Sequence, residues 1–116
     1  MTEVSAWEIV ATEVKDSKAI ALDAEYFDAY YNLGALFFNK AVEQNNAAND
    51  IPPNKPKEYE AKKAEAITTF KKARPHLEKA EQLQPDDFNT LQSLKQLYAF
   101  VKDNENYKRV SAKLKN

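Results

Sequence analysis

The stretch Tyr26–Ala41, which reads YFDAYYNLGALFFNKA, carries apolar side chains on two faces of one predicted helix. Because an α-helix turns once every 3.6 residues, these side chains form two stripes roughly 100° apart around the axis. The first stripe is Phe27, Tyr30, Leu33 and Phe37, and the second is Tyr31, Ala35, Phe38 and Val42. A helix on the surface of a domain needs only one apolar stripe, so this helix is predicted to be covered on two sides.

Gly34, the single glycine of the chain, stands in the middle of this helix. Glycine in a helix interior costs about 1 kcal/mol relative to alanine. We therefore expect a packing reason for it, such as the close approach of another helix.

The composition predicts an all-α fold. The 116 residues are rich in Ala, Leu, Lys, Glu and Gln, with one Gly and few β-branched side chains, and their length suits one domain or a piece of a repeat array. Polar and proline-rich breaks divide the chain into five predicted helices, and the tandem Pro52–Pro53 is the clearest of these breaks. The predicted helices span residues 2–22, 26–49, 57–84, 87–101 and 105–114.

The charges are unevenly distributed along the chain. The net charge of −1 argues against nucleic-acid binding. Residues 1–50 carry a net charge of −6, however, and residues 51–116 carry +5. Two interpretations stay open, namely attraction between neighbouring helices of one chain and a polar head-to-tail contact between chains.

Several classes of site find no support in the residues. The chain has no cysteine, so disulfides and thiolate catalysis are excluded. His76 is the single histidine, which leaves a zinc site short of ligands. Asp86 and Asp87 precede a predicted helix, where capping is the favoured role. We therefore expect no catalytic residue, no metal and no cofactor.

The sequence shows neither a membrane span nor a signal peptide that would indicate the compartment. No apolar run approaches the ~20 residues of a membrane span, so we expect no membrane insertion. Residues 1–10 include Glu3 and Glu8 and lack a basic segment, unlike a signal peptide. The compartment stays open.

The order of aromatic, Leu-Gly and Ala positions resembles the tetratricopeptide repeat (TPR) family. The first helix of such a repeat is matched here by Tyr30, Leu33, Gly34 and Phe37. Its second helix and terminal turn are matched by Ala73, Leu77, Ala80 and Pro85. Phe88, Leu91, Leu94 and Tyr98 resemble the first helix of another repeat, with Lys95 in place of the glycine and, earlier, Ala24 in place of the usual turn proline.

The resemblance implies a right-handed array of about five helices in a single domain over residues 1–116. The usual repeat has 34 residues, yet the equivalent Phe27 and Phe88 lie 61 positions apart. This excess implies one extended hairpin over residues 26–84, similar to long hairpins in bacterial members of the family. Residues 87–116 then form the last repeat and its cap. Residues 1–22 resemble the second helix of a truncated repeat, which suggests a fragment of a larger protein.

In this family the first helix of each repeat lines a concave groove that holds a peptide. The positions that the resemblance places in this groove are Tyr31, Ala35, Phe38, Asn39, Asn89, Gln92, Gln96 and Phe100. Aromatic side chains supply contact area there and amides can pair with a peptide backbone. The alternative is that Tyr31 and Phe38 are covered by residues 1–22 or by another chain. The groove lacks the cations with which some members bind a chaperone's terminal carboxylate, so we do not expect that activity.

These observations favour a non-catalytic module that binds a peptide or protein segment. The alternative is a structural spacer or self-association domain within a larger multi-repeat protein, with a homodimer through the N-terminal helix and its Trp7 as one form of self-association.

Overall fold

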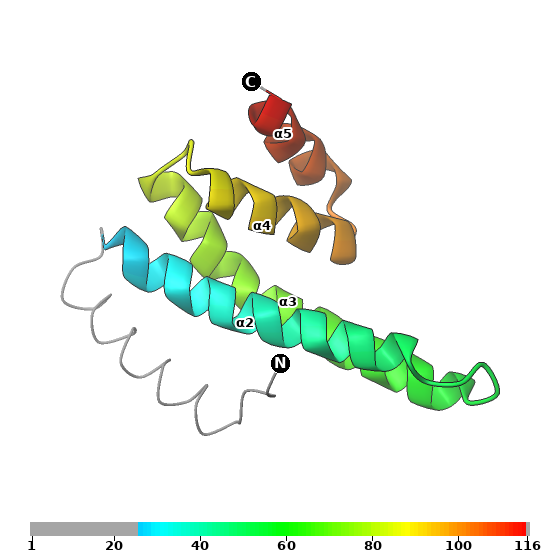
Figure 1. The fold of residues 1–116 in the computed structure, drawn as a ribbon. Helices are drawn as coiled ribbons and strands as arrows, with labels where there is room; N and C mark the ends of the chain where they lie inside the picture. The colour runs from blue at the N-terminus through cyan, green and yellow to red at the C-terminus, as the bar shows by residue number, and fades with distance from the viewer. Residues whose placement is uncertain (1–25, 116) are drawn as a thin grey trace.

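The computed structural model describes residues 26–115, which form four α-helices and no strand (Figure 1). The helices are α2 (Phe27–Asn49), α3 (Pro56–Leu83), α4 (Phe88–Phe100) and α5 (Asn104–Lys115). The all-helical class is therefore confirmed for the described part of the chain, and each helix begins and ends within one residue of its predicted position. The helix predicted over residues 2–22 lies outside the described residues.

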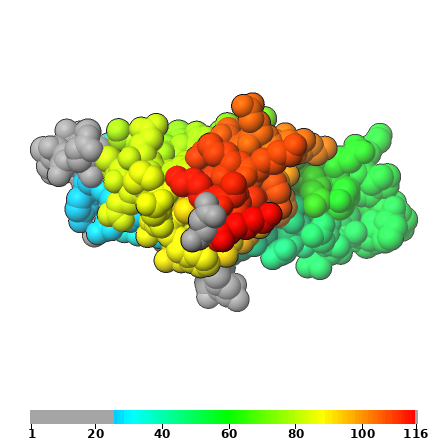
Figure 2. Space-filling view, turned by 90° about the horizontal axis from the view of Figure 1, so that it is seen from above, coloured from blue at the N-terminus to red at the C-terminus, as the bar shows by residue number. Residues whose placement is uncertain are grey.

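A long hairpin of α2 and α3 forms one half of this structure. The two helices run side by side in opposite directions, and their connection projects beyond α4 and α5 (Figures 1 and 2). The tandem prolines exclude a continuing helix, and Lys55 N donates to Pro52 O at 3.0 Å to close a turn. Pro56 then starts α3, where its missing N–H costs no helical hydrogen bond.

Gly34 lies at a close approach between α2 and α3. A Cβ atom at this position would lie 2.7 Å from Leu77 Cγ and 3.2 Å from Leu77 N. The predicted packing reason for the glycine is thus confirmed, and Leu77 is the residue that requires it.

Polar caps determine where the two shorter helices begin. The Asp87 carboxylate accepts hydrogen bonds from Thr90 N at 2.9 Å and from Thr90 Oγ1 at 2.8 Å, which caps α4. The Asp103 carboxylate accepts from Asn106 N at 3.2 Å in front of α5. The capping role expected for Asp87 is confirmed.

Helix α4 ends in a tight reversal centred on Lys102. Asp103 N donates to Tyr98 O at 2.9 Å and Lys102 N donates to Ala99 O at 3.3 Å, which is the Schellman pattern. Lys102 has φ = 60°, a left-handed conformation in which glycine is usual. The reversal folds α5 back along α4.

One apolar core joins the hairpin to the two shorter helices. Its buried members are Leu33, Phe37, Phe38, Ala41, Phe70, Ala73, Leu77, Leu91, Leu94, Leu97, Tyr98 and Val110. Helix α2 packs on α3, α3 on α4 and α4 on α5, and α2 also contacts α4. Within residues 26–115, no Cα atom of α2 lies within 8 Å of a Cα atom of α5. These helices therefore lie in order along the array, with α2 and α5 separated by α4.

None of the four described helices combines the length and apolar character that a membrane crossing would need.

Candidate protein-interaction face

The eight residues predicted for a peptide groove lie on α2 and α4, and we call this set the α2–α4 face. On α4, the predicted positions recur at intervals of three or four residues and so form one stripe. Four of the eight side chains are exposed, three are half-buried and one is buried. The exposed ones are Asn39, Asn89, Gln92 and Gln96, the half-buried ones are Tyr31, Ala35 and Phe100, and the buried one is Phe38.

Phe70 of α3 brings the two helices of this face together. The Phe38 ring meets the Phe70 ring edge to face with 5.6 Å between centroids. The Phe100 ring stacks on the same Phe70 ring at 4.3 Å with the planes 12° apart. Such pairs add about 0.5–1.5 kcal/mol beyond the area that they bury. Phe38 is only 9% exposed, so its main role in the described structure is to hold the face in shape.

The remaining apolar part of the face is half-exposed. Tyr31 stacks on Phe27 with 5.9 Å between ring centroids and packs against the core. Phe100 also packs against the core from the outside and is only partly buried, as is Val42, which lies one turn beyond Phe38 and outside the predicted set. These three side chains retain apolar surface that a further group could cover.

On α4, three exposed amides lie on the same stripe as Phe100. An amide side chain offers two donors and an acceptor, which matches the alternating N–H and C=O groups of an extended peptide. Gln92 and Gln96 lie one turn apart on α4 and are exposed, so both can reach such a backbone. The arrangement combines apolar contact area with unspecific hydrogen-bonding capacity.

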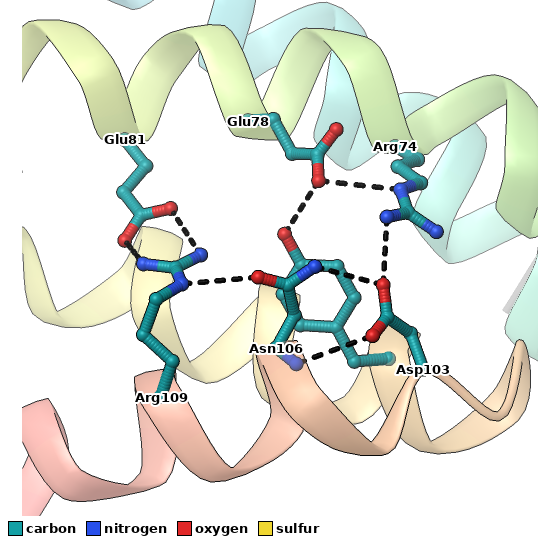
Figure 3. Close-up of polar contacts among 7 residues, drawn as sticks. Arg74, Glu78, Glu81, Asp103, Asn106 and Arg109 are labelled. Atoms are coloured by element: carbon teal, nitrogen blue, oxygen red, sulfur yellow. Dashed lines mark hydrogen bonds and ion pairs between the residues drawn. The ribbon is translucent and has the colours of Figure 1, made fainter.

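A second polar cluster, which the sequence did not predict as such, joins α3 to the C-terminal helices (Figure 3). Tyr98 Oη donates to Glu78 Oε2 at 2.7 Å, and Arg74 Nε donates to the same oxygen at 3.2 Å. Arg74 also donates through NH2 to Asp103 Oδ2 at 2.7 Å. Arg74 thereby links α3 to the residue that caps α5.

Glu81 forms the other half of this cluster. Arg109 donates to both of its carboxylate oxygens, at 2.5 and 2.9 Å, and Lys113 donates to one of them at 3.1 Å. Arg109 Nε additionally donates to Asn106 Oδ1 at 3.1 Å (Figure 3). The two-pronged contact between Arg109 and Glu81 fixes the orientation of α5 as well as its distance from α3.

The surroundings shift the pKa values of these groups. Burial opposes ionisation of Glu81, but hydrogen bonds from Arg109 and Lys113 outweigh burial and leave the pKa of its carboxyl below the ordinary value. Burial, followed by donation to Glu78, raises the pKa of Tyr98 far above its usual range. Hydrogen bonds from Asn106, assisted by Arg74, lower the pKa of Asp103. The charged carboxylates and the neutral phenol are therefore the forms that the fold stabilises.

The charged side chains of this cluster pair with one another, within α3 and across helices. The cluster therefore acts as a clamp that holds α3 to the C-terminal helices. The sequence contained one usable signal. Asp103 stands three residues before Asn106 in a turn, which is the spacing of a helix cap. Nothing in the spacing indicates that Arg74, 29 positions earlier, reaches the same carboxylate.

The single histidine lies against an aromatic ring. The His76 ring stacks on Phe37 with 6.1 Å between centroids and the planes 11° apart. Within residues 26–115, no group of three or more His, Cys, Asp or Glu side chains could hold a metal ion.

Two cavities of the described structure are lined by none of the eight residues of the α2–α4 face. One of about 280 Å³ lies at the tip of the hairpin, lined by Ile51, Pro52, Pro53, Pro56 and Tyr59. The other, of about 430 Å³, lies between the start of α4 and the end of α5, lined by Asp86, Phe88, Leu91, Lys113 and Leu114.

Comparisons of the chain with protein-family models, with curated proteins and with solved structures give no match.

Proposed function

We propose that this chain is a non-catalytic interaction module, and that it binds an extended peptide or protein segment across the α2–α4 face. The observation that carries the proposal is the row of accessible amides beside half-buried aromatic side chains. Apolar contact would supply most of the affinity and the amides would hold the backbone of the ligand.

We also propose that the helices form a TPR-like right-handed array with one extended hairpin. Two features support this arrangement. Gly34 of α2 lies against Leu77 of α3, and both positions belong to the repeat pattern. Pro85 lies in the short connection that leads from α3 into α4, where the repeat pattern has its terminal proline.

The experiment begins with selection of peptides from a random displayed library on the immobilised chain. Selected peptides are then titrated against the wild type and against the double variant Gln92→Ala/Gln96→Ala, by fluorescence polarisation. We expect the double variant to weaken binding about tenfold or more, because each lost amide leaves backbone groups of the peptide unpaired.

Gln82→Ala is the matched control, since Gln82 is an exposed glutamine on α3 outside the α2–α4 face. Removal of exposed amides should change the free energy of unfolding by less than about 0.5 kcal/mol, which urea denaturation checks. The proposal fails if no peptide is enriched, or if the selected peptides bind the double variant and the wild type equally.

A further inference from the structure

The end of the array formed by α4 and α5 has an unfilled apolar hollow. The cavity of about 430 Å³ between the first turn of α4 and the last turn of α5 has Leu91, only 3% exposed, and Leu114 in its lining. Phe88 stands at the same cavity with 61% of its surface exposed. We call this cavity with its five lining residues the end pocket.

Phe88 is the most exposed large apolar side chain of residues 26–115. Its backbone position at the start of α4 is fixed by the Asp87 cap, so the ring is held out from a rigid element. An exposed aromatic ring beside an apolar floor is typical of an interaction site, because both are removed from water when a partner binds.

The lining of the end pocket holds one cation and one carboxylate, and two further lysines stand close to it on α4 and α5. Lys113 belongs to the lining but is already paired with Glu81. Lys115 follows Leu114 directly, and Lys95 lies on the stripe of Phe88 and Leu91, one turn further along α4. Asp86 is the single carboxylate of the lining. Lys115 forms no ion pair with another residue of the described range 26–115, so its charge is available to a partner. A partner for this surface should therefore be acidic and should carry an apolar anchor.

The chain itself contains a segment of this chemistry. Residues 1–25 hold six acidic and two basic side chains, a net charge of −4. The same segment has Val4, Trp7, Val10 and Val14 at helical spacing, including the single tryptophan of the protein. Its charge and its apolar anchor both complement the end pocket.

We infer that the end pocket is a self-association site, which receives the acidic N-terminal segment of a second copy of this chain. The segment precedes α2 in the chain, whereas the end pocket lies between α4 and α5, so the donor and the acceptor are different parts of the chain. Such a contact is head-to-tail, so each copy has one free segment and one free pocket, and copies can add in an open series.

Sedimentation velocity over a range of protein concentrations tests this inference. We expect the average mass of the wild type to rise with concentration, and Phe88→Glu to weaken association about tenfold or more because a carboxylate replaces the aromatic contact. Higher salt should also weaken the association of the wild type, since exposed charges are screened. Tyr59→Glu is the control, because Tyr59 is an exposed aromatic residue at the distant hairpin tip.

A mixing experiment then separates a head-to-tail contact from a symmetric one. Phe88→Glu retains its segment and Trp7→Ala retains its pocket, so each variant alone should be impaired in association. An equimolar mixture should form a dimer and no larger species, because only one working contact remains. Circular dichroism confirms that both variants keep the helix content of the wild type.

Three results would overturn the inference. The first is a wild type that stays monomeric up to roughly 1 mM, beyond the range of a weak interface. The second is association that Phe88→Glu leaves unchanged. The third is a mixture in which the two variants fail to restore each other. A monomer in which Phe88→Glu shifts the Trp7 fluorescence would place the N-terminal segment in the pocket of its own chain, and that also excludes the second copy.

Discussion

At the scale of the residue, Gly34 shows how one missing side chain determines the distance between two helices. Its backbone allows Leu77 of α3 to come within reach of α2, and Leu77 is fully buried as a result. Two opposing effects meet at this position. An alanine would gain about 1 kcal/mol of helix propensity, but its Cβ would meet both the side chain and the backbone nitrogen of Leu77.

We expect Gly34→Ala to destabilise the fold by about 1–2 kcal/mol, because overpacking of a buried contact costs more than the helix propensity returns. Urea denaturation followed by circular dichroism measures the change. In a Leu77→Ala background, where the opposing side chain is gone, the same substitution should be neutral or stabilising. A Gly34→Ala protein that is more stable than the wild type would contradict the close approach.

At the scale of the element, the hairpin of α2 and α3 extends well beyond the shared core. Its outer part is held by polar contacts, with Gln44 Nε2 donating to Glu65 Oε1 at 2.8 Å and Lys63 Nζ donating to Asn45 Oδ1 at 2.7 Å. Ala48 is fully buried, so the tip also has a small apolar contact of its own. None of the core residues lies between residues 46 and 57.

Deletion of residues 46–57, with the helices rejoined by a short turn, should therefore leave the core folded. We expect a cooperative thermal transition with helix content reduced only by the deleted residues, because Ala48 is the one fully buried side chain that the deletion removes. Circular dichroism during heating measures both quantities. Loss of the cooperative transition would mean that the tip stabilises the array in a way that its contacts do not reveal.

The helices could be predicted from sequence because local residues decide where they stop. The tandem prolines end α2, and the Asp87 carboxylate caps the start of α4. A few adjacent residues therefore determine each of these two boundaries. The sequence also predicted which side of α2 faces the core, since Leu33 and Phe37 of the first stripe are buried.

Contacts between distant elements could not be predicted in the same way. Arg74 and Glu81 both lie on α3, yet Arg74 reaches Asp103 in front of α5 and Glu81 reaches Arg109 on α5. The predicted interaction residues Phe38 and Phe100 meet on Phe70, which depends on the rotation of each helix about its axis. Spacing in the sequence predicts the apolar stripe on each helix. It does not predict the rotation of each helix about its axis, which decides which stripes meet.

At the scale of the whole molecule, the clamp around Glu81 makes stability depend on pH. The folded protein lowers the pKa of this carboxyl below the ordinary 4.5, so the folded state favours its charged form. For a lowered pKa the added stability is fully present above the unfolded value and is lost as the pH falls through the folded value. The loss thus begins near pH 4.5 and continues below it.

We expect Glu81→Gln to lower the free energy of unfolding by about 1–2 kcal/mol at neutral pH, a figure reduced because Arg109 is 43% exposed. The difference from the wild type should shrink as the pH falls below 4.5, when the wild-type carboxylate also becomes protonated. Urea denaturation at a series of pH values measures this dependence. Glu105→Gln is the control, as Glu105 is an exposed carboxylate on α5, and an equal pH dependence in both variants would rule out the clamp.

The order in which the helices contact one another also bears on how quickly the chain can fold. Each described helix packs on the next one in the sequence. The contact between α2 and α4 joins helices that have one helix between them in the sequence. Contacts between near neighbours need only short loops to close, and this places such topologies among those that fold in microseconds to milliseconds. The six-residue connection between α2 and α3 is one such loop, so the hairpin is the natural first structure on which α4 and then α5 can assemble.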